Sequence, residues 1–285
     1  MTVTRTAAGI SNEHLFYGSE ATVYVEGGDS KRPAAVDASV DILFWRGIFE
    51  AFAAGRQFHF KAKGGKQTLL QIVNQLENGA VKAVIVCLDR DLDHVRGLRT
   101  VPGVIYTWGY SWENDVWSAD VVEDVFYILC GVDRNQAEVR AQIGEGLRHF
   151  SCALRWAVRA DVLMAACGRA IVPRGNFKCV IPPDRGWPTI DRTFLRSCVR
   201  AARAETSAVI HKLPSGMDVA VLQDVYGHLL GFFCYRMLAS LMKTYCRESI
   251  SRSNASALAI NTNKCSMRPE VLHHYRQQFA SLSDD

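Results

Sequence analysis

The sequence predicts an α/β fold with a mostly parallel sheet in its first part and a mainly helical region after it. Three observations support this prediction. Short apolar runs alternate with runs of helical periodicity between residues 21 and 108, which is typical of right-handed crossovers in a parallel sheet. The run at residues 80–88 is almost continuously apolar, as expected of a strand buried on both faces. Beyond about residue 121 the pattern changes to long helical runs.

The first part contains four expected strands. Residues 21–25 form a β-branched apolar strand that ends at Glu26, and residues 41–54 follow with helical spacing, with Asp41 as the expected N-cap. A second strand is expected at residues 57–63, and Gly64-Gly65 then leads into a helix at residues 66–77. The third strand, residues 80–88, ends at Asp89, and a fourth is expected at residues 103–108. We therefore expect an α/β domain over residues 1–125.

The second part reads as helical. Helices are expected over residues 136–167, 191–205 and 217–248, and a segment rich in proline and glycine at residues 172–188 interrupts them. We expect a helical domain over residues 126–285, for dimerisation or for binding of a partner or substrate.

Composition limits the partners, the redox environment and the cellular location that we expect for the protein. The net charge of +4 and pI of 8.6 are mildly basic, which is compatible with a polyanionic partner without indicating one. Nine cysteines include no Cys-x-x-Cys pair and read as reduced, mostly buried thiols. The beginning of the chain lacks the apolar core of a secretory signal, and the best apolar stretch, residues 229–242, is too short to span a membrane. We expect a cytoplasmic protein without a membrane segment.

Acidic residues follow three of the expected strands. Glu26 follows the first, Asp89 and Asp91 follow the third, and Glu113 lies beyond the fourth. In parallel sheets the carboxyl ends of the strands lie at one edge, where ligands usually bind, so we expect these carboxylates to converge. Carboxylates in this number repel one another unless a cation neutralises them, and hard oxygen ligands suit Mg²⁺ or Mn²⁺. Phosphoryl chemistry is the natural use of such a site.

The order of these motifs resembles a known family. The sequence contains Val25-Glu26-Gly27, Asp41-Ile42-Leu43-Phe44, Gly64-Gly65-Lys66, Asp89-Arg90-Asp91 and Trp112-Glu113-Asn114. Over about residues 20–120 this is similar to the TOPRIM domains of topoisomerases, primases and nucleases, and most of all to the TOPRIM effector nucleases of the PARIS anti-phage defence systems. The resemblance implies a Rossmann-like TOPRIM fold and a toxic Mg²⁺-dependent endonuclease. It also implies an effector that an ABC-type ATPase partner holds inactive and that cleaves host tRNA, as a homodimer, when released.

The resemblance also implies roles for single residues. Glu26 would be a general acid or base or a metal ligand, Asp89 and Asp91 would hold the metal, and Glu113 would be a further ligand or an orienting carboxylate. Lys66 begins a helix, where an ammonium group and the helix end both favour a phosphate. The family's remaining Asp could be Asp29, Asp37 or Asp41, because the segment at residues 28–40 is longer than in relatives.

Other interpretations remain open at this point. The chain could be a TOPRIM-derived interaction module without turnover, or a nuclease directed at DNA; a primase is the least favoured because no zinc ribbon is present.

Other residues with possible functional roles have simpler structural readings. His228 reads as a structural histidine, and His94 is not expected to bind a metal. The aromatic residues are expected to pack a sheet against helices or to stack on bases; they are Tyr106, Trp108, Tyr110, Trp112 and Trp117. Four arginines share one helix face that either contacts phosphates or is simply solvated; they are Arg192, Arg196, Arg200 and Arg203.

Overall fold

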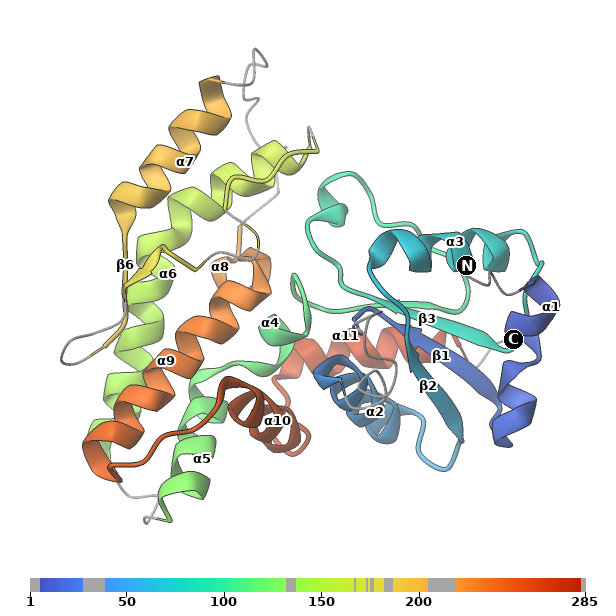
Figure 1. Cartoon of the computed structure of the whole chain (residues 1–285), viewed down its shortest axis with the longest axis horizontal. Helices are drawn as coiled ribbons and strands as arrows, with labels where there is room; N and C mark the ends of the chain where they lie inside the picture. The colour runs from blue at the N-terminus through green and yellow to red at the C-terminus, as the bar shows by residue number, and fades with distance from the viewer. Residues whose placement is uncertain are drawn as a thin grey trace, which may run out of the picture. The chain divides into compact units, whose positions relative to one another are not determined.

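A computed structural model describes residues 6–27, 39–131, 137–166, 168–172, 174, 177–181, 187–204 and 219–282. The chain forms two compact units, shown in Figure 1. The first unit consists of Met1–Asp89, Arg99–Trp108 and Met267–Asp285, and the second of Arg90–Leu98 and Gly109–Ser266. The chain therefore enters the second unit twice and ends in the first.

A four-stranded sheet is the centre of the first unit. Its strands are β1 (Ala21–Val25), β2 (Phe58–Ala62), β3 (Val84–Leu88) and β4 (Val104–Tyr106). They lie in the order β2-β1-β3-β4, and every pair is parallel, which confirms the predicted parallel sheet. Val25 pairs with Ala62 on one side and with Cys87 on the other. The carboxyl ends of β1, β2 and β3 are therefore level.

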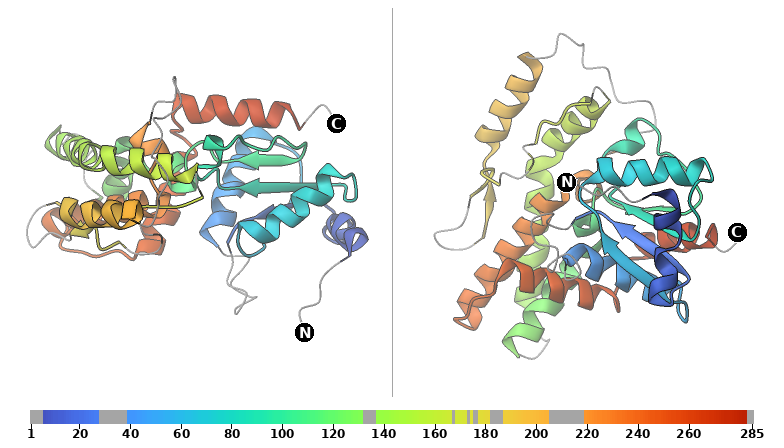
Figure 2. Two further views of the ribbon diagram at one scale, coloured as in Figure 1. Left: turned by 90° about the horizontal axis from the view of Figure 1, so that it is seen from above. Right: turned by 45° about the vertical axis from the view of Figure 1, so that its right-hand side comes forward.

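Helices cover both faces of this sheet (Figure 2). On one face, α3 (Lys66–Glu77) and α1 (Ala7–Ser11) enclose a core with side chains of β1, β3 and β4. On the other face, α2 (Val40–Phe52) packs against β1 and β2, and α11 (Pro269–Ala280) packs against α2 and β4. Rings of α2 and α11 meet edge to face, with centroids 4.9 Å apart for Phe49 and Phe279. The last helix of the chain thus completes the first unit.

Some expected boundaries in the first unit were wrong, and the fourth strand, expected to reach residue 108, ends at Tyr106. Asp41 is not the N-cap of α2; Ser39 precedes the helix, and its Oγ accepts the N–H of Ile42 at 3.2 Å. The strand expected over residues 80–88 begins only at Val84, because Ala83 has a positive φ of 52°, which interrupts an extended backbone. The helix expected at residues 66–77 begins and ends as predicted.

The second unit is mainly helical. Its helices are α4 (Trp112–Val116), α5 (Ala119–Cys130), α6 (Ala137–Ala165), α7 (Arg192–Ala204), α8 (Val221–Asp224), α9 (Gly227–Tyr245) and α10 (Arg252–Asn263). One short antiparallel pair, β5 (Val180–Ile181) with β6 (Thr189–Ile190), accompanies them. α5 packs against α6, α9 and α10.

The single helix expected at residues 217–248 is instead divided into α8 and α9. The side-chain amide of Asn114 donates to the carbonyl oxygens of Leu222 and Val225, at 2.8 and 3.0 Å. The last carbonyl oxygens of a helix lack intrahelical donors, and a side chain can satisfy them. A contact from a residue far away in the sequence therefore stabilises the end of α8.

The interpretation of all nine cysteines as reduced thiols was wrong for two of them. Cys130 and Cys246 form a disulfide, with Cα atoms 5.8 Å apart and a sequence separation of 116. The two cysteines lie close together because Cys130 ends α5, Cys246 comes directly after α9, and α5 packs against α9. Cys87, Cys179 and Cys234 are free and buried, as expected.

Among the described helices, none combines the length and the apolar character that crossing a bilayer requires.

Candidate functional site

Three predicted site residues come together at the carboxyl end of the sheet in the first unit. Glu26 directly follows β1, Asp89 directly follows β3, and Lys66 begins α3. The Oε1 atom of Glu26 accepts the backbone N–H of Asp89 at 3.1 Å, and Lys66 Nζ donates to the carbonyl oxygen of Asp89 at 2.7 Å. All three side chains are half-buried. Two carboxylates and an ammonium group thus share one end of the sheet.

The backbone next to β1 brings a further carboxylate to this end. The N–H of Gly27 donates to the carbonyl oxygen of Gly64 at 3.0 Å, which ties the residues after β1 to those after β2. Gly27 has a φ of +102°, and a Cβ there would lie 2.4 Å from Oδ2 of Asp41. The carboxylate of Asp41 therefore lies against the backbone that follows Glu26. Of the three candidates for the family's Asp, it is the one that the structure describes; Asp29 and Asp37 lie outside the described residues.

A preformed metal cage is not present in the described parts of the chain, since no group of three or more His, Cys, Asp and Glu side chains there is arranged to hold an ion. The donor set of the first unit nevertheless fits Mg²⁺. Mg²⁺ is usually bound by one or two carboxylates and completes its shell with water and substrate phosphate oxygens. Glu26 and Asp89 supply that number of carboxylates from adjacent parallel strands.

The other two predicted site residues, Asp91 and Glu113, belong to the second unit. The convergence of all four carboxylates on one sheet edge accordingly stays a prediction. Asp91 adopts a left-handed backbone conformation with a φ of +50°, and its N–H donates to the carbonyl oxygen of Tyr110 at 2.7 Å. Burial raises the pKa of the Tyr110 phenol, and the nearby charge of Asp91 raises it further. Asp91 is thus held at a fixed position by backbone and side-chain contacts to one tyrosine.

Arg90, between the two aspartates, points into the second unit. It is buried and donates from Nη2 to Oδ1 of Asp224 at 2.8 Å, and Asp224 is itself buried. Burial lowers the pKa of Arg90, and the charges of Asp224 and Asp115 oppose that shift. Removing one partner of a buried ion pair is strongly destabilising. We interpret Arg90 as the residue that anchors the Asp-Arg-Asp segment.

Glu113 has a different setting, because both of its oxygens contact side chains. It is 2% exposed, and its Oε2 accepts the hydroxyl of Ser111 at 2.5 Å. Its Oε1 is hydrogen-bonded to Nδ1 of His228, whose side chain is 49% exposed. A carboxylate bonded to Nδ1 fixes the orientation of an imidazole ring. Of the two roles expected for Glu113, this arrangement fits that of an orienting carboxylate.

The pairing of His228 with Glu113 was not predicted from the sequence. Gly227 and Gly231 allow α9 to approach α4: a Cβ on Gly227 would lie 1.8 Å from Oγ of Ser111, and one on Gly231 would lie 3.1 Å from Cγ of Glu113. Two glycines four residues apart on one helix face are a sequence signal for such a close approach. The sequence gives no sign of which residues that face approaches.

Most of the aromatic group in residues 106–117 packs rather than offering faces for bases, whereas Trp108 is half-buried. Four of its members are 1–7% exposed: Tyr106, Tyr110, Trp112 and Trp117. Arginines of the second unit stack on aromatic rings instead. The guanidinium of Arg174 lies 4.8 Å from the ring centroid of Tyr110 and 4.9 Å from that of Tyr226. These rings thus help to position cations as well as filling the core.

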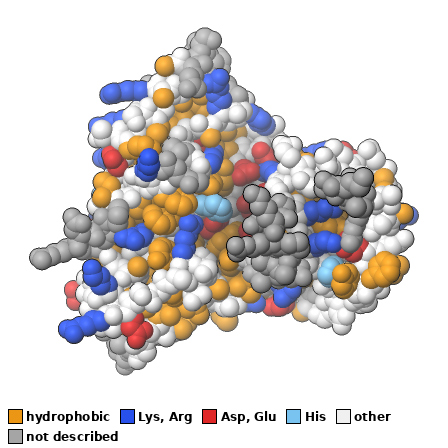
Figure 3. All heavy atoms as spheres, viewed as in Figure 1, with side chains coloured by type: hydrophobic (Ala, Val, Ile, Leu, Met, Phe, Trp, Pro, Cys, Tyr) orange, Lys and Arg blue, Asp and Glu red, His pale blue; other side chains and the backbone are white. Residues whose placement is uncertain are grey.

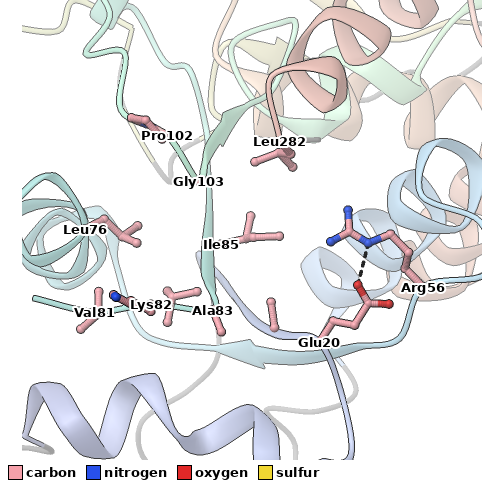
Figure 4. A pocket seen from close by; sticks show the side chains of 12 residues that line it. Glu20, Arg56, Leu76, Val81, Lys82, Ala83, Ile85, Pro102, Gly103 and Leu282 are labelled. Carbon is pink, nitrogen blue, oxygen red and sulfur yellow. Dashed lines mark hydrogen bonds and ion pairs between the residues drawn. The ribbon is translucent and has the colours of Figure 1, made fainter. Parts of the chain in front are cut away.

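An open pocket of about 480 Å³ lies at the other end of the sheet (Figure 4). Its lining includes Glu20, Ala83 and Gly103, which precede β1, β3 and β4. Of the described residues that line it, one is acidic, and that residue, Glu20, accepts from Nε of Arg56 at 2.8 Å. Because ligands of open parallel sheets bind at the carboxyl ends of the strands, we place the candidate site at Glu26 and Asp89 and not in this pocket.

Comparison with known proteins assigns no family to this chain. No family model matches it, and no curated protein matches its sequence.

Proposed function

We propose that this chain is a metal-dependent endonuclease of the TOPRIM type that cleaves RNA. The observation that carries the proposal is the contact between Glu26 and Asp89, which follow adjacent parallel strands and share a hydrogen bond of 3.1 Å beside Lys66. The order of the motifs in the sequence supports the same reading. Carboxylates brought together in this way, with one cation close by, are suited to binding a metal ion and a phosphate.

The candidate residues have different proposed roles. Glu26 and Asp89 would hold Mg²⁺ or Mn²⁺, which when bound polarises a scissile phosphate and activates water; a further ligand role for Asp91 rests on the motif resemblance alone. Lys66 would attract the phosphate, because its ammonium group lies at the N-terminus of α3. Glu113 would act indirectly, by fixing the orientation of His228.

The biological setting that we propose rests on the motif resemblance. The chain would be the toxic effector of an anti-phage system, held inactive by an ABC-type ATPase and cleaving host tRNA, as a homodimer, when released. Co-purification of the chain with the product of a neighbouring ATPase gene would support this setting. Failure of the two proteins to associate would contradict it without affecting the proposed chemistry.

Cleavage is tested with the purified full chain, released from any partner, on labelled tRNA, single-stranded DNA and duplex DNA. We expect cleavage of tRNA with Mg²⁺ or Mn²⁺ and none with EDTA. Glu26→Gln and Asp89→Asn should each lower the rate at least about 100-fold, which is the scale of losses when a transition-state contact is removed. Cleavage of DNA in preference to RNA would redirect the proposal to a DNA nuclease.

Glu20→Gln is the matched control, since Glu20 precedes β1 and Glu26 follows it. Its rate should equal that of the unchanged chain. Equal rates for Glu26→Gln and Glu20→Gln would overturn the proposal.

A non-catalytic interaction module is the second candidate, because the paired carboxylates of Glu26 and Asp89 also suit a metal or partner that is bound without turnover. Titration calorimetry with Mn²⁺ separates the two. Metal binding that Glu26→Gln abolishes, without cleavage of any nucleic acid, would establish the module.

A further inference from the structure

An arginine-rich surface extends over α6 and α7 in the second unit. On α6, Arg148, Arg155 and Arg159 are exposed, and their spacing of seven and four residues places them on one helix face. On α7, Arg192, Arg196 and Arg200 are exposed at spacings of four. In Figure 3, basic side chains are visible over the part of the molecule where these helices lie, with hydrophobic and uncharged ones between them. The side chain of Arg203 lies outside the described residues.

A contact joins the two arginine rows into one surface. Nη2 of Arg192 donates to the carbonyl oxygen of Cys152 at 3.2 Å. Cys152 is exposed, and it lies four residues after Arg148 and three before Arg155, so it belongs to their face of α6. The row on α7 therefore begins beside the middle of the row on α6. We call these six arginines the α6–α7 surface.

Few acidic groups balance this charge. Glu145 pairs with Arg148 at 3.3 Å, whereas Asp161 is buried and contacts Arg174. Asp191 accepts the N–H groups of Thr193 and Phe194. In the described part of the chain, no carboxylate pairs with the remaining cations of the surface, which are Arg155, Arg159, Arg192, Arg196 and Arg200. Like charges at a spacing of four destabilise a helix slightly, so the row on α7 does not serve stability.

The apolar face of α7 packs against the interior of the second unit. Val199 packs in a cluster with Ala160, Met164 and Ile171, and Leu195 is buried as well. The exposed face thus offers charge without an apolar centre. Protein interfaces usually have an apolar core, and an interfacial membrane helix needs exposed apolar side chains. Interfaces with nucleic acids are instead polar and strongly positive.

We propose that the α6–α7 surface binds the phosphate backbone of RNA. It would hold the substrate by charge alone, without reading its sequence, because arginines that contact phosphates fix position rather than specify bases. The choice of RNA over DNA rests on the proposed function, whereas the phosphate contacts do not.

The experiment measures binding of the full chain to a fluorescent RNA stem-loop in EDTA, by anisotropy, at several salt concentrations. The test variant replaces Arg155, Arg159, Arg196 and Arg200 with Gln. We expect at least about tenfold weaker binding, and a slope of log K against log salt that is smaller in magnitude by about three to four, because each of the four lost phosphate contacts lowers it by about 0.7–0.9. Circular dichroism and thermal melting verify that the variant folds.

The control removes four positive charges elsewhere, with Lys243, Arg247, Lys264 and Arg276 replaced by Gln. It should keep both the affinity and the salt slope. The proposal is overturned if the test variant binds like the unchanged chain, if the control loses as much, or if the unchanged chain does not bind RNA at low salt. Binding of polyglutamate or anionic vesicles in place of RNA would also overturn it.

This test is separable from the proposed nuclease activity. In a Glu26→Gln background the four Arg→Gln changes should weaken binding by the same factor as in the unchanged chain, because the assay contains no metal and no cleavage step. A chain that binds RNA through this surface but never cleaves it would refute the nuclease and retain the surface.

Discussion

Glu26 in the first unit and Glu113 in the second are both acidic candidates, but their surroundings differ. Glu26 is half-buried, and its Oε1 accepts a backbone N–H, that of Asp89. Glu113 is 2% exposed, and a hydroxyl and an imidazole contact its two oxygens. A half-buried carboxylate can exchange partners with a ligand at low cost, whereas a buried and bonded one contributes to the fold. The comparison predicts that Glu26 matters for chemistry and Glu113 for stability and orientation.

The disulfide should give the largest change in stability, and it belongs to the second unit alone. It closes a segment of 116 residues, so Cys130→Ser should lower the free energy of unfolding by about 2–5 kcal/mol. Urea unfolding of the oxidised protein measures this. Cys265→Ser is the control, since Cys265 is free and exposed, and it should have no effect. Equal stabilities for both variants would show that the bond does not form in solution.

Replacing the two glutamates tests the comparison itself. Glu113→Ala should destabilise by about 2–4 kcal/mol, because it leaves the Ser111 hydroxyl and Nδ1 of His228 without their acceptor. Glu26→Ala should change stability by less than about 1 kcal/mol, because water can replace its partner. Chemical denaturation of both variants under one set of conditions provides the measurement. Similar losses for both would remove the distinction between the two carboxylates.

The approach of α9 to α4 is tested at Gly227. A Cβ there would overlap Oγ of Ser111 at 1.8 Å, so Gly227→Ala should cost about 1–3 kcal/mol through overpacking. Gly144 in α6 has no atom within 4 Å of such a Cβ. Gly144→Ala should therefore be neutral or stabilise by up to about 1 kcal/mol, as helix propensity predicts. Thermal melting compares the two, and a neutral Gly227→Ala would contradict the close approach.

The smallest expected effect is a pH dependence at His94. Burial lowers the pKa of His94, and Arg90 lowers it further, against the opposing charges of Asp224 and Asp93. The imidazole of His94 therefore binds a proton more readily in the unfolded chain than in the folded chain. The stability due to neutral His94 is present above its ordinary pKa of about 6.5 and is lost as the pH falls through that value. Between pH 7.5 and 5.5 the unchanged chain should lose more stability than His94→Gln in urea titrations; identical losses would exclude this contribution.

Local patterns predicted the first unit well. The helical spacing of Leu69, Ile72 and Val73 predicted α3 at its observed bounds, and the apolar run before Asp89 predicted β3. Local chemistry also explains the error at Asp41, because two residues near the start of the helix, Ser39 and Asp41, can both cap it and the backbone selects one.

Contacts between distant residues could not be predicted in this way. Glu113 and His228 are separated by 115 positions, and Cys130 and Cys246 by 116. The contact of Asn114 with the end of α8 likewise joins distant residues. Periodicity reports which face of an element is buried, but not which element covers it.

The role of Glu26 is tested most directly by the rate of tRNA cleavage by Glu26→Gln relative to Glu20→Gln, in Mg²⁺, with RNA binding measured in the same preparations. We predict a ratio of about 0.01 or less with retained RNA binding. A ratio near one would contradict the assignment of Glu26 to the chemistry.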